Sequence, residues 1–196
     1  MTLHVTRDEI HADLTWLIGA IARAVHGCCR DNPGVLFMLH ALAEADLSTG
    51  ALKPLPQKSA RACSHLPLAL ARLLAEQEEV AQALAGAWEH LRWRDLASHV
   101  AEAPVVGSDG PFVSARVSLS VLVLGEGARY PWPVEQDRSR LHVALLGRMN
   151  WTVENGMRLL MQAPMSLFVE AGCAATCRVE QGPALLVSLS TTAPAG

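Results

Sequence analysis

The chain has 196 residues, of which 51% are hydrophobic and 18% are charged, and its formal net charge is -3. This composition is typical of a folded protein with a substantial core, and the absence of a basic stripe argues against nucleic acid as a partner. No apolar run is long enough to cross a membrane and no secretion signal is evident, so we expect no membrane association and a cytoplasmic location.

The chain begins with a predicted amphipathic helix. Apolar residues recur at steps of three and four from Ile10 to Val25, which places them on one helix face. Thr6, with Glu9 three residues later, fits a capping box at the start of this helix. Residues 31–34, Asp-Asn-Pro-Gly, break the pattern and predict the end of the first helical segment.

Two further helices are predicted in the first half of the chain. The first covers Val35 to Ala45, and residues 49–62, with a glycine and two prolines among polar residues, are expected to form a loop. A continuous stripe of leucines then predicts one long helix from Ser64 to about Arg92. Ser64 would cap this helix, and Pro67 lies in its first turn, where a missing N–H costs little.

The second half of the chain has the pattern of an antiparallel β-structure. Short runs rich in Val and Leu alternate with Gly, Pro and Asn-Gly turn signals, and they lie at 104–106, 112–124, 141–146, 150–153, 158–161, 166–169, 174–180 and 184–190. Asn155-Gly156 between two such runs predicts a β-hairpin. We therefore expect an α+β fold, with a helical region over 1–93, a small antiparallel β-barrel over 94–190 and a frayed tail over 191–196.

One strand of this barrel carries a histidine among apolar residues. Alternation along Leu141–Leu146 puts His142, Ala144 and Leu146 on one face and the three intervening residues on the other. If the first face lines the barrel interior, His142 would act as a general base with a pKa near neutral. The alternative interpretation is a hydrogen-bonded histidine of the core or rim.

The five cysteines are expected to be free thiols, because their number is odd and no secretion signal is evident. Cys173 and Cys177 are separated by three residues, which suggests a metal pair. No matching second pair accompanies them, so zinc binding is not favoured.

Several landmarks stand out along the chain. They are Ser64-His65-Leu66-Pro67, the helix running to Leu91-Arg92-Trp93, Gly107-Ser108-Asp109-Gly110-Pro111-Phe112, Tyr130-Pro131-Trp132 and Gly147-x3-Trp151. In these landmarks, and in the order of a helical region before a barrel, the chain resembles the dimethylsulfoniopropionate (DMSP) lyases of the cupin superfamily. The resemblance spans most of the chain and implies a cupin barrel, which is a double-stranded β-helix or jelly roll.

The resemblance also implies a chemistry. In that family a transition metal, held by two His, a Glu and a later His, binds the substrate carboxylate, and a Tyr removes the neighbouring proton; dimethyl sulfide leaves and acrylate remains. Carried onto this sequence, the first two ligands fall on Pro133 and Glu135, the Glu on Arg140, the late His near Ala174 and the base on His142. The resemblance therefore implies a degenerate metal site, where the Arg140 cation would repel a metal.

We accordingly expect no cofactor. If a metal is bound, it would be a divalent transition metal (Zn, Fe, Mn or Ni), with Glu135 and His142 as weak candidate ligands. His142 and Tyr130 are the candidate catalytic residues. Arg140 would clamp a ligand carboxylate, or pair on the surface with Glu135 or Asp137.

Three aromatic residues are candidate ligand contacts. Tyr130, Trp132 and Trp151 would line a pocket for a quaternary or sulfonium cation, because ring faces attract such charge; ordinary barrel packing is the alternative. Glu135 would accept a hydrogen bond from such a ligand, or simply be solvated. The expected partner is thus a small carboxylate or sulfonium compound.

Three functions follow from these expectations. The first is a DMSP-lyase-like cupin that binds a small molecule, or is otherwise non-catalytic. The second is a carbon–sulfur lyase that performs β-elimination on DMSP or a similar zwitterionic carboxylate, with His142 as base and Arg140 as anchor. The third is an interaction protein, since the helical half carries a broad apolar stripe and cupins often pair through their sheets; a homodimer is expected.

Overall fold

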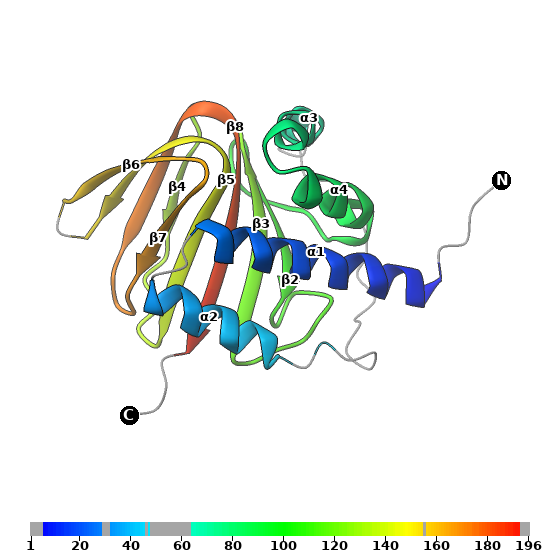
Figure 1. Cartoon of the computed structure of the whole chain (residues 1–196). Helices are drawn as coiled ribbons and strands as arrows, with labels where there is room; N and C mark the ends of the chain where they lie inside the picture. Colours follow the sequence, from blue (N-terminus) through cyan, green and yellow to red (C-terminus); the bar gives the residue numbers. More distant parts are fainter. Residues whose placement is uncertain (1–5, 29–31, 46, 48–63, 155, 193–196) are drawn as a thin grey trace.

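The computed structural model describes residues 6–28, 32–45, 47, 64–154 and 156–192. In this part of the chain every helix precedes the first strand (Figure 1). The helical elements are α1 (Arg7–Cys28), α2 (Pro33–Ala43), α3 (Leu66–Glu76), α4 (Glu78–Ala87) and a short 3₁₀ turn at Trp88–His90.

The rest of the chain forms an antiparallel sheet of eight strands that is bent into two facing halves. One half contains β1, β2, β3, the end of β8, the start of β5 and β7, whereas the other contains β4, the start of β8, the end of β5 and β6. The strands are β1 (Arg94–Ala97), β2 (Val100–Val106), β3 (Val117–Leu124), β4 (Arg129–Trp132), β5 (Arg138–Val153), β6 (Arg158–Gln162), β7 (Met165–Val169) and β8 (Ala175–Thr192).

The two long strands bend together where the halves meet. Gly147 of β5 has φ +89°, and a Cβ at this position would lie 2.8 Å from the Cβ of Ala184 on β8. A left-handed backbone this close to its partner strand admits only glycine without strain. The register between β5 and β8 shifts on either side of Gly147, between Ala144 and Met149, as expected for a bulged bend.

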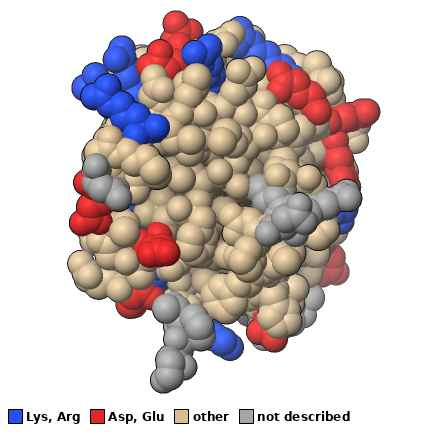
Figure 2. All heavy atoms as spheres, turned by 60° about the vertical axis from the view of Figure 1, so that its left-hand side comes forward, with Lys and Arg blue, Asp and Glu red and all other residues tan. Residues whose placement is uncertain are grey.

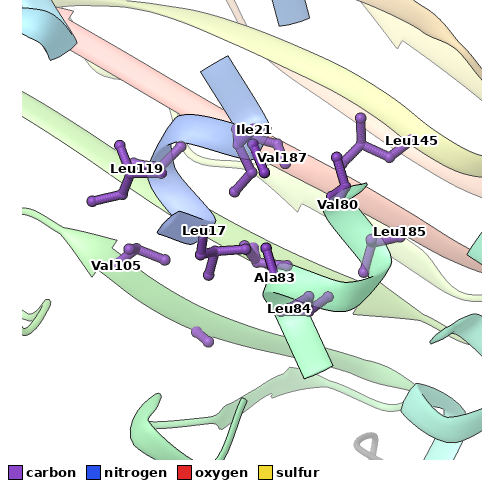
Figure 3. Packing of buried hydrophobic residues seen from close by; sticks show 14 of the residues in the cluster. Leu17, Ile21, Val80, Ala83, Leu84, Val105, Leu119, Leu145, Leu185 and Val187 are labelled. Carbon is purple, nitrogen blue, oxygen red and sulfur yellow. The ribbon is translucent and has the colours of Figure 1, made fainter. Parts of the chain in front are cut away.

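The helices cover the outer face of the first sheet half, so the inner face of that half lines the barrel interior. Figure 1 shows α1 and α2 lying across this sheet, and Figure 3 shows side chains of α1 and α4 packed on it. The contacting side chains include Leu17, Ile21, Val80 and Leu84 from the helices and Leu119, Leu145, Leu185 and Val187 from the strands. A second apolar cluster lies on the inner faces of the two sheet halves.

The first predicted helix is confirmed. Its apolar stripe is buried as expected, and the backbone N–H of Thr6 donates to the Glu9 carboxylate at 2.7 Å while the Glu9 N–H donates to the Thr6 hydroxyl at 3.3 Å. The second helix starts two residues earlier than predicted, at Pro33, because Asn32 caps it by accepting from the backbone of Gly34 and Val35. The predicted loop at 49–62 lies outside the described residues.

The prediction of one unbroken helix from Ser64 to Arg92 is wrong. The chain breaks at Gln77, whose φ of -147° and ψ of 71° are not helical. The side-chain amide of Gln77 donates to the carbonyl of Leu145 at 3.1 Å and so ties this break to β5. Ser64 does not cap α3, because the residue at the cap position is His65, which makes no side-chain capping bond.

The β-rich character of the second half is confirmed, but the number of breaks was overestimated. The runs 141–146 and 150–153 are one strand, β5, and the runs 174–180 and 184–190 are one strand, β8. The hairpin expected at Asn155-Gly156 connects β5 to β6, with Gly156 at φ +76° and Asn155 outside the described residues. Thr191 and Thr192, predicted to be frayed, end β8, and the side chain of Thr191 is buried.

The surface on the side of β4, β6 and β7 is shown in Figure 2. Its broad centre carries side chains without charge, and the charged side chains gather at its margins. Within the described residues no helix is both long enough and apolar enough to span a membrane.

Candidate functional site

Three aromatic side chains form a packed cluster inside the barrel. The ring of His142 lies 4.5 Å from that of Trp132 and 4.8 Å from that of Trp151, and the two indoles stack at 4.8 Å. Trp132 comes from β4, and Trp151 and His142 come from the two ends of β5, so the cluster joins both sheet halves. Such offset ring pairs contribute about 0.5–1.5 kcal/mol each beyond their buried area.

His142 is completely buried, and neither ring nitrogen has a hydrogen-bond partner among the described residues. Burial, assisted by the positive charge of Arg140, lowers the pKa of His142 from 6.5 to about 3. This pKa differs from the near-neutral value that the general-base expectation assumed. The imidazole is neutral at pH 7 but is a much weaker base than a solvated histidine.

The placement of His142 on the inner face is as alternation predicted, but the predicted face is only partly correct. Ala144 belongs to the interior cluster together with the rings. Leu146 instead packs with the helix-covered cluster, because the register shift between Ala144 and Leu146 reverses the direction of the side chains.

Arg140 lies two residues before His142 on the same face of β5, and only 5% of it is exposed. Its Nη2 lies 2.7 Å from Oε1 of Glu135. The approach lacks the alignment of a hydrogen bond, so Nη2 of Arg140 and Oε2 of Glu135 remain buried without a partner. The predicted pairing of Arg140 with Glu135 is thus present, with the guanidinium buried and the Glu135 side chain 37% exposed.

Tyr130 stands at the edge of the aromatic cluster. Its ring meets Trp132 edge-on at 4.6 Å, and the residue is only partly buried. Burial and the nearby Glu102 carboxylate raise the pKa of Tyr130, so its hydroxyl is protonated at neutral pH. A protonated phenol donates a hydrogen bond but removes no proton from a substrate.

Cys177 of β8 is opposite both Tyr130 of β4 and Trp151 of β5. Burial raises the pKa of this thiol to about 12, so it is protonated at pH 7 and is not a nucleophile. Cys173 lies before β8 begins and is partly exposed.

Sequence reasoning missed a row of serines on the inner face. Ser188 of β8 pairs with His142 of β5 on one side and with Ser120 of β3 on the other, while Ser190 pairs with Arg140 and Ser118. The Ser118 and Ser190 hydroxyls lie 2.7 Å apart. The signal was present in the sequence as two Ser-x-Ser patterns in Val- and Leu-rich strands, which put two hydroxyls on one face of each strand.

The donor groups at this site do not fit a transition metal. Within the described residues no three His, Cys, Asp or Glu side chains are grouped to hold a metal ion. The two weak candidates are otherwise engaged, since Glu135 pairs with Arg140 and His142 is packed against two indoles. A guanidinium next to His142 adds electrostatic repulsion, because a metal at this imidazole would lie close to a fixed positive charge.

The comparisons with known proteins concern the fold. Neither a protein-family model nor a curated protein matches this chain by sequence. Its structure is similar to one from the crystal structures of the DMSP lyases RdDddP and RnDddQII, with a TM-score of 0.67, 18% identity, and coverage of 95% of this chain and 96% of the other. The DMSP lyase DddQ from Ruegeria pomeroyi DSS-3 gives a TM-score of 0.64 at 17% identity, with coverage of 94% of both chains. The chain therefore has the cupin fold of these DMSP lyases over nearly its whole length, N-terminal helices included.

Proposed function

We propose that the protein binds a small carboxylate-bearing molecule inside the barrel, and that Arg140 and the serines, not a metal, hold the carboxylate. The observation that carries the proposal is a group of buried polar atoms that lack hydrogen-bond partners within the described residues, although Nη2 of Arg140 lies 2.7 Å from Oε1 of Glu135. They belong to His142, Arg140, Glu135 and Trp151. Each such atom costs about 1–3 kcal/mol unless a partner is supplied, so a ligand that supplies partners is stabilised there.

The arrangement favours an anion over a cation at the centre of the site. Trp132 and Trp151 stack on each other, and both contact the ring of His142, so the ring faces that meet inside the cluster are not available to a quaternary or sulfonium group. Arg140, one nitrogen of which is paired with Glu135, has a planar fork that suits a carboxylate; Ser190 is opposite it in register, and Ser188 is opposite His142. A cationic end of the same molecule would lie at the rim, against the partly exposed ring of Tyr130.

Titration calorimetry with three probes tests this proposal. The probes are DMSP and glycine betaine, which carry both charges, and propionate, which carries only the carboxylate. We expect all three to bind the wild-type protein, and Arg140→Met to raise the dissociation constants by roughly 10- to 100-fold, because a charge-assisted hydrogen bond contributes about 1.5–3 kcal/mol.

A matched control for this variant lies two residues earlier on the same strand. Arg138 donates to the carbonyl of Ala115 at the surface, so Arg138→Met should leave the affinities unchanged. Ser188→Ala provides a milder test if Arg140→Met does not fold. Heat signals absent for all three probes, or equal affinities in the Arg138 and Arg140 variants, would show that the barrel interior is not a carboxylate site.

The alternative, a carbon–sulfur lyase with His142 as base, makes a different prediction. We expect no dimethyl sulfide release from DMSP above the uncatalysed rate at pH 7, with or without EDTA, because a pKa of about 3 leaves His142 too weak a base to remove a proton next to a carboxylate. Gas chromatography of the headspace measures this. Release that is lost in His142→Ala would establish the lyase instead.

The expected homodimer and the cytoplasmic location stay predictions. The uncharged centre of the face in Figure 2 is compatible with pairing through the sheet, and light scattering at micromolar concentration measures the mass in solution.

A further inference from the structure

The outer face of the second sheet half holds a hollow of about 460 Å³ whose lining includes three arginines, Arg129, Arg158 and Arg178. These residues point away from the barrel interior. Along β4, Arg129 alternates with Tyr130, and along β8, Arg178 follows Cys177, and both of these neighbours pack in the interior cluster. The three arginines therefore lie on the opposite side of the sheet from His142, although Trp151 and Cys177 also contribute to the lining of the hollow.

The strand register brings the three cations to one surface. Arg129 of β4 is directly opposite Arg178 of β8, and Arg158 of β6 is opposite Thr152 of β5, one row further along. Thr152 is in turn opposite Thr176 of β8. Because neighbouring strands are about 4.8 Å apart, β8 and β6 are separated by roughly 10 Å, a span that two extended arginine side chains can bridge from opposite sides.

These three charges are unpaired within the described residues, although the Glu180 carboxylate lines the same hollow. All three arginines are exposed, and none has an ion pair there with a carboxylate. Glu180, the acidic residue of the hollow, accepts instead from the side-chain amide of Asn150 at 2.7 Å. Like charges directly opposite one another on antiparallel strands are destabilising, so Arg129 and Arg178 impose a cost that a bound anion would remove.

The neighbouring groups indicate which kind of anion fits. The hydroxyls of Thr152 and Thr176 lie on the Arg158 side of the Arg129–Arg178 row, and Glu180 lies on the other side, two residues beyond Arg178. An anion is therefore repelled from one end of the hollow and offered hydroxyl donors at the other. Guanidinium forks together with hydroxyl donors suit the several acceptor oxygens of phosphate groups.

We propose that this outer hollow is a binding site for a small phosphate-bearing polyanion, held between the Arg129–Arg178 pair and Arg158. The ligand needs at least two anionic groups, since the cations come from both sides of the hollow. Binding is electrostatic at an open surface and therefore weakens as the salt concentration rises.

The test is thermal unfolding of the full chain, followed by tryptophan fluorescence, in pyrophosphate, inorganic phosphate, succinate or sodium chloride at equal ionic strength. We expect Tm to rise with pyrophosphate concentration, less with phosphate, and not with succinate beyond the chloride control. Arg178→Gln should weaken the apparent affinity for pyrophosphate at least tenfold, while Arg116→Gln, at an exposed arginine outside the hollow, should respond as the wild type.

The same variant gives a second signature in the absence of anions. Arg178→Gln removes the repulsion with Arg129, so its Tm without anions should be higher than that of the wild type by about 1–3 °C, even though its response to pyrophosphate is lost. A wild-type Tm in pyrophosphate no higher than in chloride would overturn the site, as would an equal response of Arg178→Gln. An equal response to succinate would overturn the assignment to phosphate.

Discussion

The His142→Phe protein is expected to be more stable than the wild type at pH 7, by about 1–3 kcal/mol in the free energy of unfolding. The neutral imidazole has one donor and one acceptor nitrogen, both completely buried and both without a partner in the described part of the chain. Phenylalanine removes both groups and keeps a flat ring between Trp132 and Trp151. Replacement of an unsatisfied buried polar group by an apolar one of similar shape is stabilising for this reason.

The difference between the two proteins should grow as the pH falls. The pKa of His142 is about 3 in the folded protein and 6.5 when the chain is unfolded, so between these values the unfolded chain binds a proton that the folded protein does not. Acid therefore favours unfolding. Above pH 6.5 His142 does not make the free energy of unfolding depend on pH. Below pH 6.5 it lowers the free energy of unfolding of the wild-type protein by about 1.4 kcal/mol per pH unit, which amounts to roughly 5 kcal/mol at pH 3.

Urea unfolding of both proteins at pH 7.5, 6.5, 5.5 and 4.5 measures this difference. Carboxylates and the other histidines titrate in both proteins, so their effects cancel in the comparison. His142→Leu is a second apolar replacement, for the case that the larger phenyl ring overpacks the site. His40→Phe, at a side chain that is 72% exposed, is the control and should keep the wild-type pH dependence of stability. Parallel curves for the wild type and His142→Phe would mean that His142 is not buried in its neutral form.

The sequence predicted the direction of side chains within single strands better than the paths of the strands. Alternation placed His142 and Ala144 on the inner face correctly, because period two is a local property of the backbone. Gly147 was interpreted as a strand end, although β5 continues through it. A positive-φ glycine permits either a turn or a bend, and here the bend is fixed by the close approach of Ala184 on another strand.

The helix break at Gln77 also had no local signal in the sequence, because a contact with a distant strand fixes it. The leucine stripe continues across it, and what holds the non-helical residue is a hydrogen bond to the Leu145 carbonyl, 68 residues away. At the site, the sequence predicted the pairing of Arg140 with Glu135 but not its burial, since only the folded barrel decides which strand face is enclosed. Burial also sets the pKa of His142, so the sequence alone could not predict that pKa either.

Trp151→Ala is expected to cost about 3–5 kcal/mol of the free energy of unfolding, the largest loss that we predict for a single substitution in the site. Trp151 is completely buried and is among the largest fully buried side chains of the described residues. Its removal opens a cavity, and it breaks the stacking with Trp132 and His142 through which the two sheet halves meet. Trp132 is expected to keep only part of its packing, because its remaining ring contacts at this site are with His142 and, edge-on, with Tyr130.

The matched control is Trp16→Ala on α1, at a side chain that is 41% exposed, which we expect to change the stability by less than about 1 kcal/mol. Urea unfolding at pH 7.5 compares the two variants with the wild type. Trp151 packs against His142, which lies two residues from Arg140 on β5. Trp151→Ala should therefore also weaken propionate binding in protein that remains folded, whereas Trp16→Ala should not. If both variants lose the same free energy of unfolding, the ring cluster inside the barrel does not link the two sheet halves, and it does not hold the residues of the binding site in place.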